Sequence, residues 1–83
     1  MLRRFWFKLS SNGMPSVLNI GCGITAYDMN YAWAFLSRDV FPALGEREVL
    51  EVVVDVDVST LDQTHVIPNM AAPSNRGVWF PRL

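Results

Sequence analysis

Apolar and polar side chains alternate most regularly between Glu48 and Ser59, which read EVLEVVVDVDVS. An extended chain there would place the apolar residues on one face and the acidic residues on the other. The apolar set is Leu50, Val52, Val54, Val56 and Val58, and the acidic set is Glu51, Asp55 and Asp57. A period of two in a run of β-branched residues is typical of a half-buried strand. We therefore predict a strand around which the whole sheet is organised, with its valine face in the core.

A second alternating run, from Leu2 to Leu9, predicts another strand. Its two faces carry Phe5, Phe7 and Leu9 on one side and Arg4, Trp6 and Lys8 on the other. Opposite charges on neighbouring strands attract. We therefore expect ion pairs from Arg4 or Lys8 to the acidic face of the 48–59 strand.

The region after the first strand is rich in turn-forming residues from Ser10 to Ser16, including Asn12-Gly13 and Pro15. Val17–Ile20 is short and apolar, which predicts the return strand of a hairpin, ended by Gly21-Cys22-Gly23.

The chain from about 26 to 40 predicts the principal helix. Thr25 and Asp28 have the spacing of a capping box, and Pro42 should stop the helix near Phe41. An apolar stripe at helical spacing comprises Met29, Ala32, Trp33, Leu36 and Val40. Further aromatic side chains, Tyr27, Tyr31 and Phe35, lie off that stripe and indicate a second contact surface on the helix.

The remaining chain predicts little regular structure before a last strand. Ser59 to Asp62 repeats the capping-box spacing and should begin one helical turn, after which Val66–Arg76 forms an irregular connection. Gly77–Phe80 is a strand that Pro81 places at a sheet edge. The elements together predict a single α+β domain over residues 1–83. It should contain a mostly antiparallel sheet of three or four strands, with one helix (about 26–40) packed on one face.

Composition indicates that the fold needs additional stabilisation. A chain of 83 residues buries a small core, yet 51% of the residues are hydrophobic and 12% aromatic. One cysteine cannot form an internal disulfide, which leaves self-association as the expected support. The aromatic residues predicted to form the interface of a homo-oligomer are Trp6, Tyr27, Tyr31, Phe35 and Trp79.

Charge and hydropathy narrow the range of partners. A formal net charge of −1 argues against a nucleic-acid binder, which would carry a basic stripe. No apolar run approaches the length of a membrane span, and Lys8 interrupts the only segment resembling a signal peptide. We expect a cytoplasmic protein, consistent with one free thiol.

Candidate chemistry is sparse. Cys22 and His65 form the one conceivable nucleophile and base pair, and Asp55, Asp57 and His65 the one conceivable metal site. A small buried cysteine and a solvated acidic face explain these residues more simply. We therefore assign no catalytic residue, no metal and no cofactor, and favour a non-enzymatic role.

The segment VLNIGCG, from Val17 to Gly23, resembles the first motif of Rossmann-like S-adenosylmethionine methyltransferases. That resemblance implies a glycine loop against the cofactor. Ile24-Thr25 departs from the motif, and 83 residues cannot build the doubly wound sheet that holds the cofactor. Glycines that break a strand before a helix are the simpler interpretation.

Three further blocks, GCGITAYD, DVDVSTLDQTHVIPNM and GVWFPR, resemble segments of small uncharacterised bacterial proteins, a resemblance that implies no activity. Within the second block and its loop, we expect His65, Asn69 and Asn75 to form a polar cluster. The sequence thus favours a self-associating interaction module that acts by binding. The alternative is a small ligand-binding or catalytic protein with a pocket between the Cys22 loop and the His65–Arg76 connection.

Overall fold

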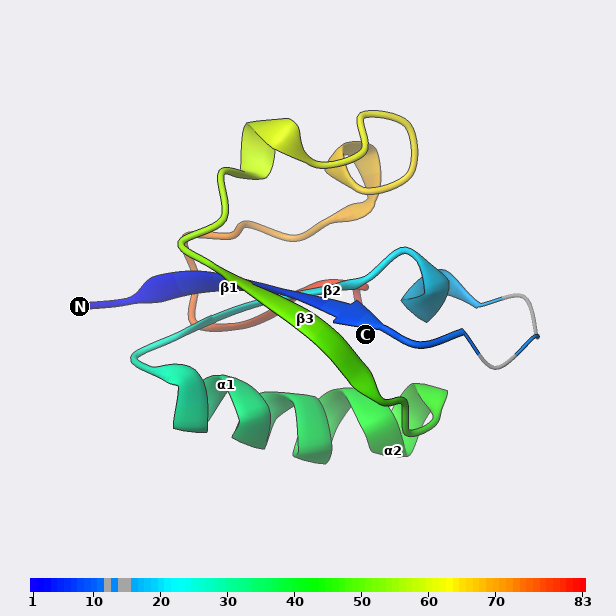
Figure 1. Cartoon of the computed structure of the whole chain (residues 1–83). Coiled ribbons are helices and arrows are strands. Elements are labelled where there is room, and N and C mark those ends of the chain that lie inside the picture. Colours follow the sequence, from blue (N-terminus) through cyan, green and yellow to red (C-terminus); the bar gives the residue numbers. More distant parts are fainter. Residues whose placement is uncertain (12, 14–15) are drawn as a thin grey trace.

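The structure, a computed structural model, describes residues 1–11, 13 and 16–83. Four antiparallel strands form one sheet in the order β3-β1-β2-β4 (Figure 1). Their bounds are β1 Arg3–Leu9, β2 Cys22–Ala26, β3 Val49–Val54 and β4 Gly77–Phe80. The predicted α+β fold, with one main helix packed on the sheet, is confirmed. Asn12 and Pro15 of the predicted turn lie outside the described residues.

Strand β3 lies at an edge of the sheet, so the prediction that it organises the whole sheet is wrong. β1 and β2 hold the two central positions, because β1 pairs with β2 and β3, and β2 pairs with β1 and β4. The register of β1 and β3 shifts at Leu9, where Val49 rather than Leu50 faces the neighbouring strand. This bulge interrupts the alternation, and Leu50 is 63% exposed instead of buried. β3 ends at Val54, because the next residue, Asp55, has a φ of 57° that lies outside the strand region.

Of the two cations predicted to pair with the acidic strand, Lys8 does so, whereas Arg4 makes no ion pair in the described part of the chain and its Nε donates to the Pro73 carbonyl across 3.4 Å. Lys8 Nζ lies 3.6 Å from a carboxylate oxygen of Glu51, as expected for directly opposed residues. Asp55 instead receives two hydrogen bonds from the guanidinium of Arg3, with N–O distances of 3.0 and 2.6 Å. These pairs join β1 to β3 along their exposed surface.

The predicted strand at Val17–Ile20 is wrong. Val17–Asn19 is a short 3-10 helix, η1, whose first turn is capped by Ser16 Oγ accepting from the Leu18 N–H. The return strand comes later, as β2, in which all five residues are buried. Because Thr25 belongs to β2, it does not cap the helix; Asp28 does so by accepting a hydrogen bond from the Tyr31 N–H.

The main helix runs past Pro42, so its predicted end near Phe41 is wrong. It consists of α1 (Met29–Phe35), a π-helical segment η2 (Leu36–Val40) and α2 (Phe41–Leu44). Proline has no N–H and clashes with the preceding turn of a regular α-helix. The wider π-helical segment ends at Val40, two residues before Pro42, and Gly45, whose φ is 98°, caps the end of the helix.

Both faces of the sheet are covered, each by a different kind of structure (Figure 1). The main helix covers one face, and its buried cluster is Phe5, Phe7, Leu9, Leu18, Cys22, Ile24, Ala26, Ala32, Leu36 and Val40. The segment from 55 to 76 covers the other face, where the buried cluster is Trp6, Val56, Val66, Trp79 and Phe80. The face of β1 predicted to be polar therefore belongs to a second core.

The covering segment contains two short 3-10 helices, η3 (Val58–Thr60) and η4 (Ile67–Asn69). The helical turn predicted to begin at Ser59 is displaced, because Asp57 caps η3 by accepting from the Ser59 N–H and hydroxyl. Thr25 Oγ1 donates to the Pro73 carbonyl across 2.6 Å and ties the segment to β2. The irregular connection predicted for Val66–Arg76 is otherwise as expected.

Two glycines make room for two tryptophans in the second core. A Cβ at Gly21 would lie 2.4 Å from the Trp6 ring, and one at Gly23 would lie 2.4 Å from the Trp79 ring. The two indoles also pack on each other, with centroids 5.9 Å apart. Gly21-Cys22-Gly23 thus permits close packing of aromatic rings.

Candidate functional site

The candidate pair Cys22 and His65 is not brought together by the fold. Cys22 is fully buried in the cluster between the helix and the sheet, and burial raises the pKa of its thiol to about 12. His65 is exposed and lies in the segment that covers the opposite face of the sheet. A protonated thiol without solvent access cannot act as a nucleophile.

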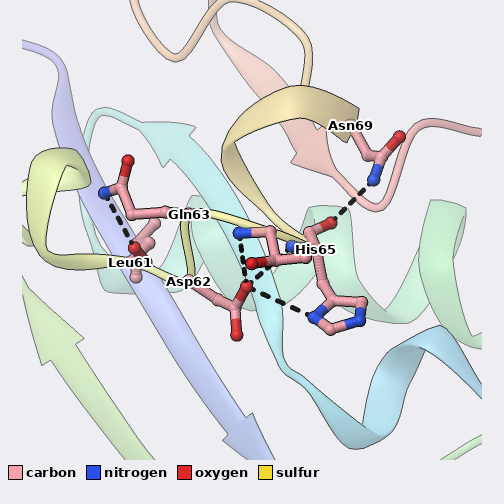
Figure 2. A network of polar contacts seen from close by, with 6 residues as sticks. Leu61, Asp62, Gln63, His65 and Asn69 are labelled. Carbon is pink, nitrogen blue, oxygen red and sulfur yellow. Dashed lines mark hydrogen bonds and ion pairs between the residues drawn. The ribbon is translucent and has the colours of Figure 1, made fainter.

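His65 is instead part of a local network centred on the Asp62 carboxylate (Figure 2). Asp62 Oδ1 accepts the backbone N–H groups of His65 and Thr64 and lies 3.3 Å from His65 Nδ1. These contacts, chiefly the His65 and Thr64 N–H groups, lower the pKa of the Asp62 carboxyl. The result is a hydrogen-bonded turn that places the imidazole at the surface.

The predicted polar cluster of His65, Asn69 and Asn75 forms in part. Asn69 Nδ2 donates to the backbone carbonyl of His65 across 3.0 Å, as Figure 2 shows. His65 and Asn69 also line the same surface groove, which does not include Asn75. Asn75 lies further along, where its backbone N–H bonds to the Ala72 carbonyl.

This groove lies between η1, the His65 loop and the residues after β4. It has a volume of about 620 Å³ and is lined by Ser16, Val17, Ile20, His65, Pro68, Asn69, Phe80, Pro81 and Arg82. Two aliphatic residues, two prolines and Phe80 form its apolar walls, and its polar groups come from Ser16, His65, Asn69 and Arg82. The groove takes His65, Pro68 and Asn69 from the His65–Arg76 connection but no residue of Gly21-Cys22-Gly23, so the pocket predicted between the Cys22 loop and that connection stays a prediction.

The candidate metal ligands are each engaged elsewhere. Asp55 binds Arg3, and Asp57 caps η3; both contacts lower the pKa of the carboxyl concerned, chiefly through the hydrogen bonds from Arg3 and from Ser59 respectively. Within residues 1–11, 13 and 16–83, no three side chains of the types His, Cys, Asp or Glu approach closely enough to hold a metal ion.

The five predicted interface aromatics divide into two groups. Trp6 and Trp79 are 5% and 1% exposed, so the chain itself covers them and they cannot meet a partner. Tyr27 and Tyr31 are 51% and 56% exposed, and Phe35 is half-buried. Only the second group, around the beginning of the helix, remains accessible.

Two arginines that the sequence did not point to lie against these accessible rings. The Arg76 guanidinium lies 5.6 Å from the Tyr27 ring centroid and 5.9 Å from that of Phe35, and Arg38 lies 6.0 Å from Phe35. We call Tyr27, Tyr31, Phe35, Arg38 and Arg76 the aromatic–arginine patch. Arg38 could have been found from the sequence, since it follows Phe35 by one helical turn. Arg76 is remote in the chain and carries no such signal.

Comparisons with known proteins identify no relative of this chain. No family model, no curated protein and no solved structure matches the chain. The resemblance of the three sequence blocks to small bacterial proteins therefore stays a prediction. In the part of the chain that the structure describes, no helix has the length and apolar character needed to cross a membrane.

Proposed function

We propose that the protein is a self-associating interaction module in which two copies join through the free edges of strand β3. The observation that carries this proposal is the composition of that edge. Among the described residues β3 pairs only with β1, and its six residues VLEVVV contain neither lysine nor proline, two residue types that commonly protect an edge. Leu50 and Val54 are exposed on it at 63% and 39%.

Two-fold symmetry limits the registers in which two β3 strands can pair. In an antiparallel pair related by a two-fold axis, a strand meets an identical strand running in the opposite direction. A register centred on Val52 sets Leu50 opposite Val54 of the second copy, and Glu51 opposite Val53. A register centred on Glu51 would oppose two like charges, which is unfavourable. The apolar register therefore supports association of two β3 strands into a continuous sheet.

The aromatic–arginine patch is a poorer surface for self-association. A two-fold contact through the patch would bring Arg38 and Arg76 of each copy close to the same cations of the other. Like charges in a contact cost free energy unless acids separate them. Among the described residues, no acidic side chain forms an ion pair with either arginine. We therefore assign self-association to β3 rather than to the helix face.

Light scattering after size-exclusion chromatography tests the proposal over a range of concentrations. The chain should shift from its monomer mass of 9.4 kDa toward twice that mass as concentration rises. Leu50→Lys adds a charge to the edge at an exposed position and should remove the dimer without unfolding the monomer. Val17→Lys, at a 37% exposed apolar position in η1, is the matched control and should keep it. A 9.4 kDa species at every concentration would exclude the proposal.

A second candidate function is supported by the His65 groove. Its volume of about 620 Å³ falls in the range of small-molecule sites, and it combines apolar walls with a few polar groups. We infer that it would take a small apolar ligand with an acidic group near His65 and Arg82. A fragment screen by NMR tests this, with His65→Ala and Asn69→Ala as the variants that should lose binding. Fragments that perturb residues outside the groove, and spare it, would contradict the inference.

The burial of Cys22 favours a non-enzymatic role, which we place in the cytoplasm. Cys22, the one thiol, is buried and protonated, and this removes the nucleophile of the catalytic alternative. A reduced, unpaired cysteine is common in cytoplasmic proteins.

A further inference from the structure

The aromatic–arginine patch contains a small hollow that is distinct from the β3 edge and from the His65 groove. Its volume is about 140 Å³, and its lining is Tyr31, Ala34, Phe35, Arg38 and Arg76. It lies where the exposed side of α1 meets the chain just before β4. The lining thus combines two cations with two aromatic rings and one small side chain.

The two guanidinium groups are positioned by ring contacts instead of by acids. Both lie about 6 Å from the centroid of Phe35, at 6.0 Å for Arg38 and 5.9 Å for Arg76. A guanidinium that contacts a ring still has N–H groups free to donate along its edges. The ion pairs of the described residues involve Arg3, Lys8 and His65, and neither of these two arginines. Two uncompensated cations therefore converge on one hollow in a chain whose net charge is −1.

The size of the hollow limits what can enter it. Sites for whole drug-sized molecules usually enclose about 300–1,000 Å³. A hollow of about 140 Å³ instead fits a single chemical group presented by a larger or flatter molecule. Because two arginines face it, that group should be an oxyanion able to accept bidentate hydrogen bonds.

Charge and shape together identify the group. A phosphate monoester carries about −1.5 to −2 charges at neutral pH, which balances two guanidinium groups better than a carboxylate does. Tyr31, 56% exposed at the border of the hollow, offers a flat surface on which an attached ring can stack. We propose that this hollow binds an aryl phosphate monoester, with Arg38 and Arg76 holding the phosphate and Tyr31 contacting the ring.

The proposal does not depend on self-association, because the patch and β3 are separate surfaces. It predicts saturable binding of phenyl phosphate to the full-length protein, measured by calorimetry and by NMR shifts of the arginine side chains. Benzoate and inorganic phosphate each supply only part of the chemistry and should bind more weakly than phenyl phosphate. A short peptide containing phosphotyrosine is tested as a further ligand. Tighter binding of this peptide than of phenyl phosphate assigns the ligand to a modified protein side chain, and equal or weaker binding assigns it to a free small molecule.

Substitutions in the patch test whether its two arginines bind the phosphate. Arg38→Gln and Arg76→Gln should each weaken phenyl phosphate binding by about tenfold or more, the effect of losing one charge-assisted contact. Arg76→Lys keeps the charge without the planar fork and should fall between the wild type and Arg76→Gln. Lys8→Gln removes a cation outside the patch and outside the His65 groove, and should leave the affinity unchanged. Circular dichroism confirms that each variant is folded. No saturable binding, equal binding of benzoate, or full affinity in both glutamine variants would overturn the proposal.

Discussion

The indole N–H of Trp79 donates a hydrogen bond to the hydroxyl of Thr25 across 3.1 Å in the buried interior. That hydroxyl in turn donates to the Pro73 carbonyl, so one 2% exposed threonine joins β2, β4 and the covering segment. A buried chain of three polar groups is stable only while every member has its partner.

Replacing Thr25 with valine should therefore destabilise the fold by about 1–3 kcal/mol, since valine keeps the shape but leaves the buried indole N–H of Trp79 without an acceptor. Urea unfolding followed by tryptophan fluorescence measures the loss. Thr60→Val is the matched control, because the Thr60 hydroxyl bonds the Asp57 carbonyl at the exposed surface. The control should change stability by no more than about 0.5 kcal/mol. Equal effects of the two variants would show that burial of the network is not decisive.

The contact between Gly23 and Trp79 predicts a coupled pair. Gly23→Ala alone should cost about 1–3 kcal/mol, because a Cβ there would lie 2.4 Å from the ring and force a rearrangement. In a Trp79→Leu background the ring is absent, and the same alanine should cost far less. A double-mutant cycle on the free energy of unfolding measures the difference. Strict additivity of the two substitutions would contradict this account of the glycine.

The Arg3–Asp55 pair predicts a pH dependence of stability. Hydrogen bonding from Arg3 lowers the pKa of Asp55 in the folded protein below the ordinary 3.8. A carboxyl with a lowered folded pKa contributes stability above its unfolded pKa and loses it as the pH falls through the folded value. The wild type should thus exceed Asp55→Asn in stability near neutral pH, and the two should converge below about pH 4. Asparagine also tolerates the positive φ of this position.

Urea midpoints recorded across the acidic range provide the measurement. Asp39→Asn, on the exposed side of the helix, controls for the loss of one negative charge. The difference in urea midpoint between Asp39→Asn and the wild type should stay constant across this pH range. The screened, half-exposed position of the Arg3–Asp55 pair limits its effect to a modest one. A constant gap between wild type and Asp55→Asn at all pH values would refute the assignment.

The burial of Cys22 predicts that its thiol is unreactive in the folded protein. Alkylation by iodoacetamide at mildly alkaline pH should be slower than in denaturant by about a thousandfold or more, since reaction requires opening of the core. Mass spectrometry follows the modification. Cys22→Ala should preserve the fold at a modest cost, as expected for a small apolar role. Rapid alkylation under native conditions would restore Cys22 as a reactive candidate.

Local patterns predicted the strand at Leu2–Leu9, the body of the helix, the last strand and the α+β class. Alternation and helical spacing depend on near neighbours in the chain, and here those neighbours determine which face is buried. The position of β3 was wrong because strand order depends on contacts between distant residues. Leu50 was misplaced for a related reason, since a single bulge reverses the face of every residue beyond it.

The candidate site was predictable to a smaller extent. His65 and Asn69 are four residues apart, and their contact follows from the local turn. Arg76 meets Tyr27 and Phe35 only because the covering segment returns beside the helix, which no local pattern encodes. Gly21 and Gly23 make room for two tryptophans that are distant from them in the chain. The glycine motif alone suggested a cofactor loop, but the packing of the tryptophan rings accounts for both glycines without a cofactor.

The order of strands has a consequence for how the chain acquires its structure during synthesis. β1 and β2, the first two strands to leave the ribosome, occupy the middle of the sheet, and β3 and β4 are added later at its two sides. Until residues 49–54 and 77–80 emerge, a nascent β1–β2 pair would expose both of its edges, and the face that residues 55–76 cover would stay open. The contacts that complete it join residues 40 to 57 positions apart, such as Leu9 with Val49 and Gly23 with Phe80. Folding should therefore be slow for a chain of this length, and it should finish from the centre outward.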